Sequence, residues 1–157
     1  MKKTLKHNGM AVVFSLIAIL FTAIGYGLYN LNVVSAGYFN GGKVAYFDII
    51  SIAIIGALVV SFILTLCNKG SRILSLLTGI LLLASIALIA YSFLTLINDR
   101  VYGFGVLFFS NQDVLDTMQT SENMVSAFVA IGAIAMYVVA WLTTLLRTFM
   151  NDCKKAK

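Results

Sequence analysis

Four long runs of apolar residues, separated by shorter polar segments, dominate the pattern of the chain. The runs occupy residues 10–30, 47–67, 73–97 and 125–149, and charged residues and histidine keep out of their interiors. A bilayer hydrocarbon core about 30 Å thick takes roughly 20 apolar residues in helical form, so each run is long enough to cross a membrane. The pattern predicts an all-α membrane protein, an antiparallel four-helix transmembrane bundle, with residues 1–157 as a single transmembrane domain.

Three loops connect the predicted helices: an inner loop at 68–72 and two outer loops at 31–46 and 98–124. In the first outer loop, Asn40-Gly41 stands between aromatic-rich segments. Because both residues tolerate positive φ, this pattern is typical of a β-hairpin, which we expect over 33–47.

The second outer loop is long for a connection without structure of its own. Its first part, 101–109, is apolar and aromatic but too short to span a bilayer. It predicts either a third strand, paired with the hairpin in a small outer cap, or a segment in the headgroup layer. We favour the strand.

The basic residues indicate the orientation. Those that fall at the predicted inner side are Lys2, Lys3, Lys6, Lys69, Arg72, Arg147, Lys154, Lys155 and Lys157. Only Lys43 and Arg100 fall on the other side, where five of the 6 acidic residues also lie. By the positive-inside rule, both termini are expected in the cytoplasm. A compact, lysine-rich chain without N-glycosylation sequons suits a bacterial plasma membrane.

One alternative concerns the first run. A basic start, an apolar run and the small residues Val34-Ser35-Ala36 also fit a signal peptide that is cleaved after Ala36. The run exceeds the roughly 7–15 residues usual for such a signal, so a retained helix is the preferred interpretation.

Composition and charge narrow the function. The chain is 61% hydrophobic and only 11% charged, with a net charge of +5. Its bases lie at the ends of apolar runs, where they serve as topology signals, so we expect no nucleic-acid partner. We find no ionisable residue inside a predicted span, which disfavours proton-coupled transport and voltage sensing.

No residue pattern commits the chain to catalysis, to a cofactor or to a metal. The densest polar group, Asn98-Asp99-Arg100, is interpreted mainly as a helix stop and a local ion pair. The single histidine, His7, has no Cys-x-x-Cys motif to complete a metal site. The hydroxyl side chains within the runs, such as Ser15, Thr22 and Ser85, are interpreted as helix-packing residues that bond either to their own helix backbone or across to a neighbouring helix. Ridges of small residues, such as Ala53-x-x-x-Ala57 and Ser126-x-x-x-Ala130, allow helices to approach closely.

Three functions remain open. The preferred hypothesis is a non-enzymatic accessory or scaffolding subunit; the alternatives are an oligomeric channel or transporter for a small solute and a lipid-binding protein. The expected partners are the lipid bilayer and another membrane protein or a second copy of this chain. The candidate contact residues are the aromatic and acidic side chains of the second outer loop: Tyr102, Phe104, Phe108, Phe109, Asp113 and Asp116.

Overall fold

The computed structural model describes the backbone of residues 2–68 and 71–152, and side-chain environments for 9–68 and 71–149. Within these residues all regular structure is α-helical. The helices are α1 (Lys2–Val34), α2 (Phe47–Cys67), α3 (Arg72–Phe109), α4 (Gln112–Met118) and α5 (Ser121–Asp152). Four stretches of helix, all but α4, are long and apolar enough to cross a membrane. The prediction of four transmembrane-type helices is confirmed.

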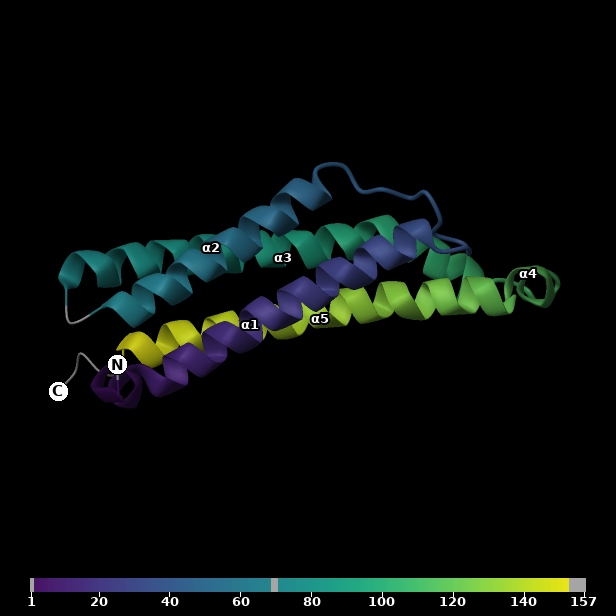
Figure 1. Ribbon diagram of the computed structural model, residues 1–157. Helices are drawn as coiled ribbons and strands as arrows, with labels where there is room; N and C mark the ends of the chain where they lie inside the picture. The colour runs from purple at the N-terminus through teal and green to yellow at the C-terminus, as the bar shows by residue number, and fades with distance from the viewer. Residues whose placement is uncertain (1, 69–70, 153–157) are drawn as a thin grey trace.

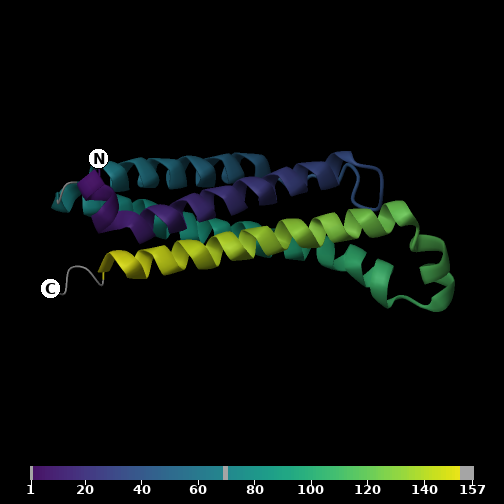
Figure 2. The ribbon, with the colours of Figure 1, turned by 60° about the horizontal axis from the view of Figure 1, so that its bottom comes forward.

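The four long helices form an antiparallel bundle (Figures 1 and 2). Helix α1 packs beside α2 and α5, and α3 packs beside the same two helices, so that α1 faces α3 and α2 faces α5 across the bundle. Helix α1 begins, α2 connects to α3 and α5 ends at one end of the bundle, which we name the inner end (Figure 1). Residues 35–46 and α4 lie at the opposite, outer end.

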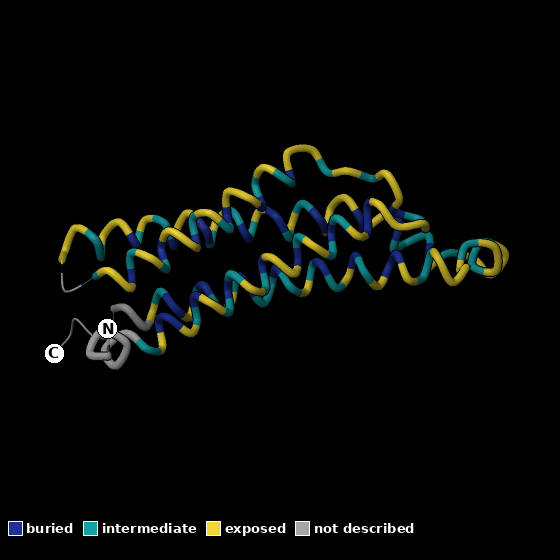
Figure 3. Tube along the Cα trace, viewed as in Figure 1, coloured by how far each residue is buried: buried dark blue, intermediate teal, exposed yellow. Residues whose placement is uncertain are grey.

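Buried positions recur every seven residues along each long helix. A seven-residue repeat keeps one stripe of a helix against its neighbours, as in left-handed helix packing. Figure 3 shows the buried stripes turned inward and the exposed residues outward. Examples are Ser15, Thr22 and Tyr29 in α1, Ile54 and Ser61 in α2, Thr78, Ser85 and Ser92 in α3, and Ala133, Ala140 and Arg147 in α5.

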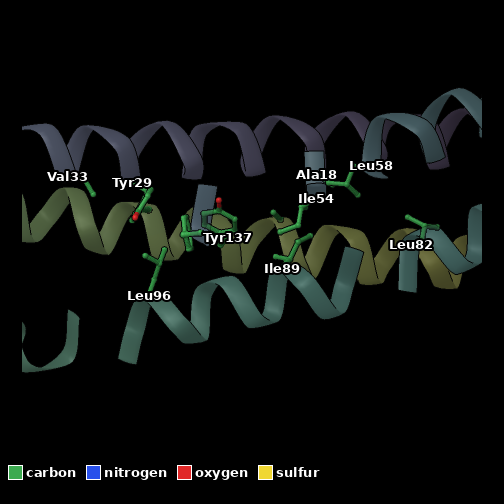
Figure 4. Packing of buried hydrophobic residues seen from close by; sticks show 12 residues of the cluster. Ala18, Tyr29, Val33, Ile54, Leu58, Leu82, Ile89, Leu96 and Tyr137 are labelled. Atoms are coloured by element: carbon green, nitrogen blue, oxygen red, sulfur yellow. The ribbon is translucent and has the colours of Figure 1, made fainter. Parts of the chain in front are cut away.

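The interior is built from small and hydroxyl-bearing residues around a modest apolar centre. Ile54, Leu58 and Ile89 meet in this centre (Figure 4). Many other large apolar side chains of the spans, such as Leu20 and Leu83, are exposed on the outside. Lipid therefore provides the apolar surroundings, and small interior residues let the helices approach closely.

Hydroxyl groups in the interior mostly bond to their own helix. The Ser15, Thr22 and Ser85 hydroxyls each donate to the carbonyl four residues earlier, at 2.6, 2.8 and 2.8 Å. The same bond recurs at Thr78 and Ser92. These bonds confirm the prediction that such residues serve helix packing.

The predicted β-hairpin over 33–47 is wrong. Residues 35–46 form consecutive turns whose bonds run back toward the end of α1: the Gly41 amide donates to the Val33 carbonyl at 2.8 Å, and the Gly42 amide donates to the Phe39 carbonyl at 3.1 Å. The segment covers the outer ends of α1, α3 and α5. We name residues 35–46 the outer loop.

The predicted strand over 101–109 is also wrong, because α3 continues through these residues to Phe109. The Asn98-Asp99-Arg100 group, expected to stop the helix, lies within it. At a rise of 1.5 Å per residue, the 38 residues of α3 extend about 57 Å, well beyond a hydrocarbon core of about 30 Å. The apolar aromatic pattern marked a helix face that packs on the outer loop.

Candidate functional site

The outer loop fills the place that α2 leaves free at the outer end of the bundle. Helix α2 begins only at Phe47, whose ring lies 4.2 Å from that of Tyr29 near the outer end of α1. Since α2 and α3 are antiparallel neighbours joined by a short connection, Phe47 is level with about residue 92 of α3. On the side where α2 would lie, the last part of α3 therefore packs against the outer loop, while it also packs against α5.

Phe39 anchors the outer loop. Its ring is buried in a second apolar cluster with Leu107, Ala127 and Ala130, and it meets the Phe104 ring edge-on at 5.5 Å. Gly103 makes this fit possible, because a Cβ atom at that position would lie only 2.5 Å from the Phe39 ring.

Arg100 holds the same loop by its backbone. Its side chain is only 3% exposed, its Nη2 donates to the Gly42 carbonyl at 2.6 Å, and its guanidinium stacks 4.7 Å above the centre of the Phe39 ring. Asp99 pairs with it at 3.3 Å, which confirms the local ion pair expected from the sequence. The buried base is thus part of the scaffold of the outer end.

Polar bonds tie the loop and α1 to the neighbouring helices. The Asn32 amide donates to the Ser126 carbonyl of α5 at 2.7 Å, and the Val44 amide donates to the Tyr29 hydroxyl at 2.9 Å. Deeper in the bundle, the Ser51 and Tyr137 hydroxyls bond at 2.7 Å across the α2–α5 diagonal. These hydrogen bonds therefore hold the outer loop and the helices firmly together at the outer end.

The structure divides the candidate contact residues into two groups. Phe104 and Phe108 are partly buried against the second cluster, with their rings 6.4 Å apart, and so belong to the packing of the outer end. Tyr102 and Phe109 are 77% and 85% exposed and lie on a different face of α3. Asp113 and Asp116 are exposed on α4, where Asp116 accepts a bond from Gln112 at 2.8 Å.

The exposed charges of the outer end are mainly negative. Four acids are exposed there, namely Asp99, Asp113, Asp116 and Glu122, against one exposed base, Lys43. The outer end therefore combines two exposed aromatic rings, those of Tyr102 and Phe109, with an excess of exposed carboxylates. Such a surface is complementary to a basic one.

The inner end holds a residue that the sequence pattern missed. Arg147 was expected at the cytoplasmic boundary, yet its side chain is 0% exposed and reaches into the bundle. Its Nη1 donates to the Ser61 hydroxyl at 2.8 Å, and its Nη2 donates to the Thr65 hydroxyl and to the Ser61 carbonyl. The conclusion that no ionisable residue lies inside a span is therefore wrong.

A signal for Arg147 was present in the sequence. It follows Ala133 and Ala140 at seven-residue spacing, so the repeat that buries these alanines also turns position 147 inward. Counting from Val125, it also lies within the fourth apolar run. Its basic character suggested a boundary residue because long basic side chains often extend to the headgroups.

The polar side chains at both ends of the bundle make hydrogen bonds and an ion pair. In the part of the chain whose side chains are described, no three histidine, cysteine or acidic residues gather closely enough to hold a metal ion. The chain matches no protein-family model, and no significant similarity to a curated protein or to a solved structure was found. Function is therefore inferred from the geometry of the two ends of the bundle.

Proposed function

We propose that this chain is a non-enzymatic accessory or scaffolding subunit of a membrane complex, which it binds through its outer end. The observation that carries this proposal is the outer extension, residues 98–118, which comprises the last part of α3 and all of α4. Helix α3 continues for roughly 25 Å beyond the level at which α2 begins. The exposed aromatic residues of the outer extension contribute little to the bundle.

The length of α2 supports this interpretation. Its 21 residues measure about 32 Å, close to the thickness of the hydrocarbon core. A bilayer that fits α2 leaves Tyr102 and Phe109 above the hydrocarbon layer, where lipid tails do not cover them. Exposed aromatic residues outside the lipid are typical of protein contact sites.

The preferred partner is a membrane protein with a basic surface just above the bilayer. The carboxylates of the outer extension would guide and orient such a partner, while Tyr102 and Phe109 would supply the apolar contact. The firmly bonded outer loop keeps α3 rigid, so that the contact surface is formed before binding.

We further propose that the inner end faces the cytoplasm of a bacterial cell and that the membrane is its plasma membrane. Arg72 at the start of α3 and Arg147 near the end of α5 lie at this end. In the sequence, Lys69 stands between α2 and α3, and Lys154, Lys155 and Lys157 follow α5. Short segments rich in lysine and arginine remain on the cytoplasmic side during insertion.

The orientation is tested by thiol labelling in a Cys153→Ser background. Cys67 is exposed at the inner end and Asn40 at the outer end. With a membrane-impermeant maleimide, we expect Asn40→Cys to be labelled in intact cells and Cys67 only after permeabilisation. Labelling of Cys67 in intact cells would reverse the orientation.

The partner proposal is tested by photo-cross-linking in native membranes. A photoreactive residue at Tyr102 or Phe109 is expected to capture one protein, whereas the same residue at Leu83, which is exposed within the span, should capture lipid. The double variant Asp113→Lys, Asp116→Lys should reduce the protein adduct at least about tenfold, since the charge of α4 is reversed.

Two results would contradict the proposal. If the outer positions capture only lipid, the lipid-binding hypothesis takes its place. If the protein adduct is unaffected by reversal of the α4 charges, the captured protein is not bound through the outer extension. An adduct with a second copy of this chain would indicate a homo-oligomeric scaffold.

A further inference from the structure

The inner end of the bundle contains a layer of buried polar side chains contributed by all four long helices. Ser61 of α2 and Arg147 of α5 are joined by a hydrogen bond. This pair lies closer to the inner end than the Ser51–Tyr137 pair on the same two helices. Thr65 and Thr144 flank this pair on the two helices. Each is at most 5% exposed.

The other two helices reach the same level. Gly25 of α1 packs on Tyr137. Since α1 and α5 are antiparallel, a step of ten residues toward the inner end of each helix brings Ser15 to the level of Arg147. Thr78 lies as many residues after the start of α3 as Ser61 lies before the end of α2. Since α2 and α3 are antiparallel, Thr78 and Ser61 are at the same level. Both are buried.

The layer carries one positive charge with no counterpart. Among the residues whose side chains are described, the only close ion pair is that of Arg100 and Asp99 at the outer end. Arg147 is bonded only to hydroxyl and carbonyl groups. Placing an unneutralised guanidinium in a low-dielectric interior costs several kcal/mol, and only an opposite charge nearby repays most of that cost.

The layer also has unused capacity to donate hydrogen bonds. The Nε of Arg147 is buried and has no hydrogen-bond partner. The hydroxyls of Ser15, Ser61 and Thr78 now donate to their own helix backbones, but a hydroxyl hydrogen can rotate toward a better acceptor. Together with the guanidinium, they form a set of donors suited to an anion.

Charge and size restrict which anion fits. A single buried positive charge is neutralised by a monovalent ion, whereas a divalent phosphate or sulfate would leave a net buried negative charge. All members of the layer are closely packed, so only a small ion can be accommodated by local shifts. Chloride has the required charge and size.

We propose that Ser15, Ser61, Thr65, Thr78, Thr144 and Arg147 form a binding site for one small monovalent anion of the size and charge of chloride. The site lies between the helices at the inner end and is separate from the outer extension. The anion holds α2 and α5 together across the bundle by neutralising Arg147.

The test uses the full-length protein purified in an uncharged detergent with gluconate as the only anion. Chloride is then titrated in at constant ionic strength while thermal unfolding is followed. We expect the unfolding temperature to rise and saturate with chloride. Sulfate, which is divalent, and gluconate, which is monovalent but large, should produce no such rise.

Three variants locate the effect. Arg147→Gln is expected to abolish the chloride-dependent rise, whereas Arg72→Gln, which removes an exposed base at the same end, should retain it. The double variant Ser15→Ala, Thr78→Ala leaves every hydrogen bond of Arg147 in place and is expected to weaken chloride binding roughly tenfold, through the loss of about 1.4 kcal/mol.

The wild-type titration decides the question even if Arg147→Gln fails to fold. Equal unfolding temperatures in chloride and gluconate would overturn the proposal and leave Arg147 as a purely structural cross-link. An equal or stronger effect of sulfate would overturn the monovalent assignment. Retention of the chloride effect in a folded Arg147→Gln protein would place the ion elsewhere.

Discussion

Gly103→Ala is expected to release the outer loop and to destabilise the outer end by about 3 kcal/mol, the cost of emptying a buried phenylalanine site. The new Cβ would lie 2.5 and 2.7 Å from two atoms of the Phe39 ring and 2.7 Å from the Tyr38 ring. Phe39 cannot retreat within its packed cluster, so it must leave. Limited trypsin digestion at Lys43 reports this release.

The expected change is large because proteolysis of a rapidly opening segment follows the open fraction. A loss of about 3 kcal/mol raises that fraction roughly 100-fold. Gly105→Ala is the matched control, since nothing lies within 4 Å of the atom it adds, and an alanine stabilises a helix by up to about 1 kcal/mol. Equal cleavage rates in the two variants would show that the Phe39 ring does not pack closely on Gly103.

Gly37→Ala is expected to be the more damaging of two matched substitutions in the outer loop. Gly37 has φ +131°, and a Cβ there would lie 2.6 Å from the Ser126 Cβ and 2.7 Å from the Glu122 carbonyl oxygen. The backbone conformation costs an alanine about 1–3 kcal/mol, and contact with the backbone of α5 adds to that cost. The loop should separate from α5, and the Asn32–Ser126 bond should be lost.

Gly41→Ala provides the comparison. Gly41 also has positive φ, at +73°, but a Cβ at that position meets nothing within 4 Å. Only the conformational cost of about 1–2 kcal/mol applies. Amide hydrogen exchange at the start of α5 should rise strongly in the Gly37 variant and little in the Gly41 variant; similar exchange would mean that Gly37 does not touch α5.

The spans could be predicted from the sequence because a bilayer imposes both length and apolar character on a helix. The runs 47–67 and 73–97 correspond closely to α2 and to the first part of α3. The outer cap could not be predicted in the same way. Alternation of aromatic and small residues over 101–109 fits a strand, but the same residues also form the helix face on which Phe39 packs.

The four-residue spacing of small residues predicts the buried face of a helix only in part. Ser126 and Ala130 are buried in α5, as expected, but Ala53 of α2 is exposed. A ridge of two or three small residues is too short to fix the rotation of a helix. The seven-residue series shared by all four helices fixes it, and the same series turns Arg147 inward.

The self-bonded hydroxyls have a consequence for how the protein is made. Ser15, Thr22, Thr78 and Ser85 find their partners within their own helices, so α1 and α3 can each enter lipid alone without leaving these groups unsatisfied. Arg147 instead depends on Ser61 and Thr65 of α2. Because the ribosome makes α2 before α5, these hydroxyls are already in the bilayer when α5 is inserted. The guanidinium can therefore bond to them as soon as it enters the membrane.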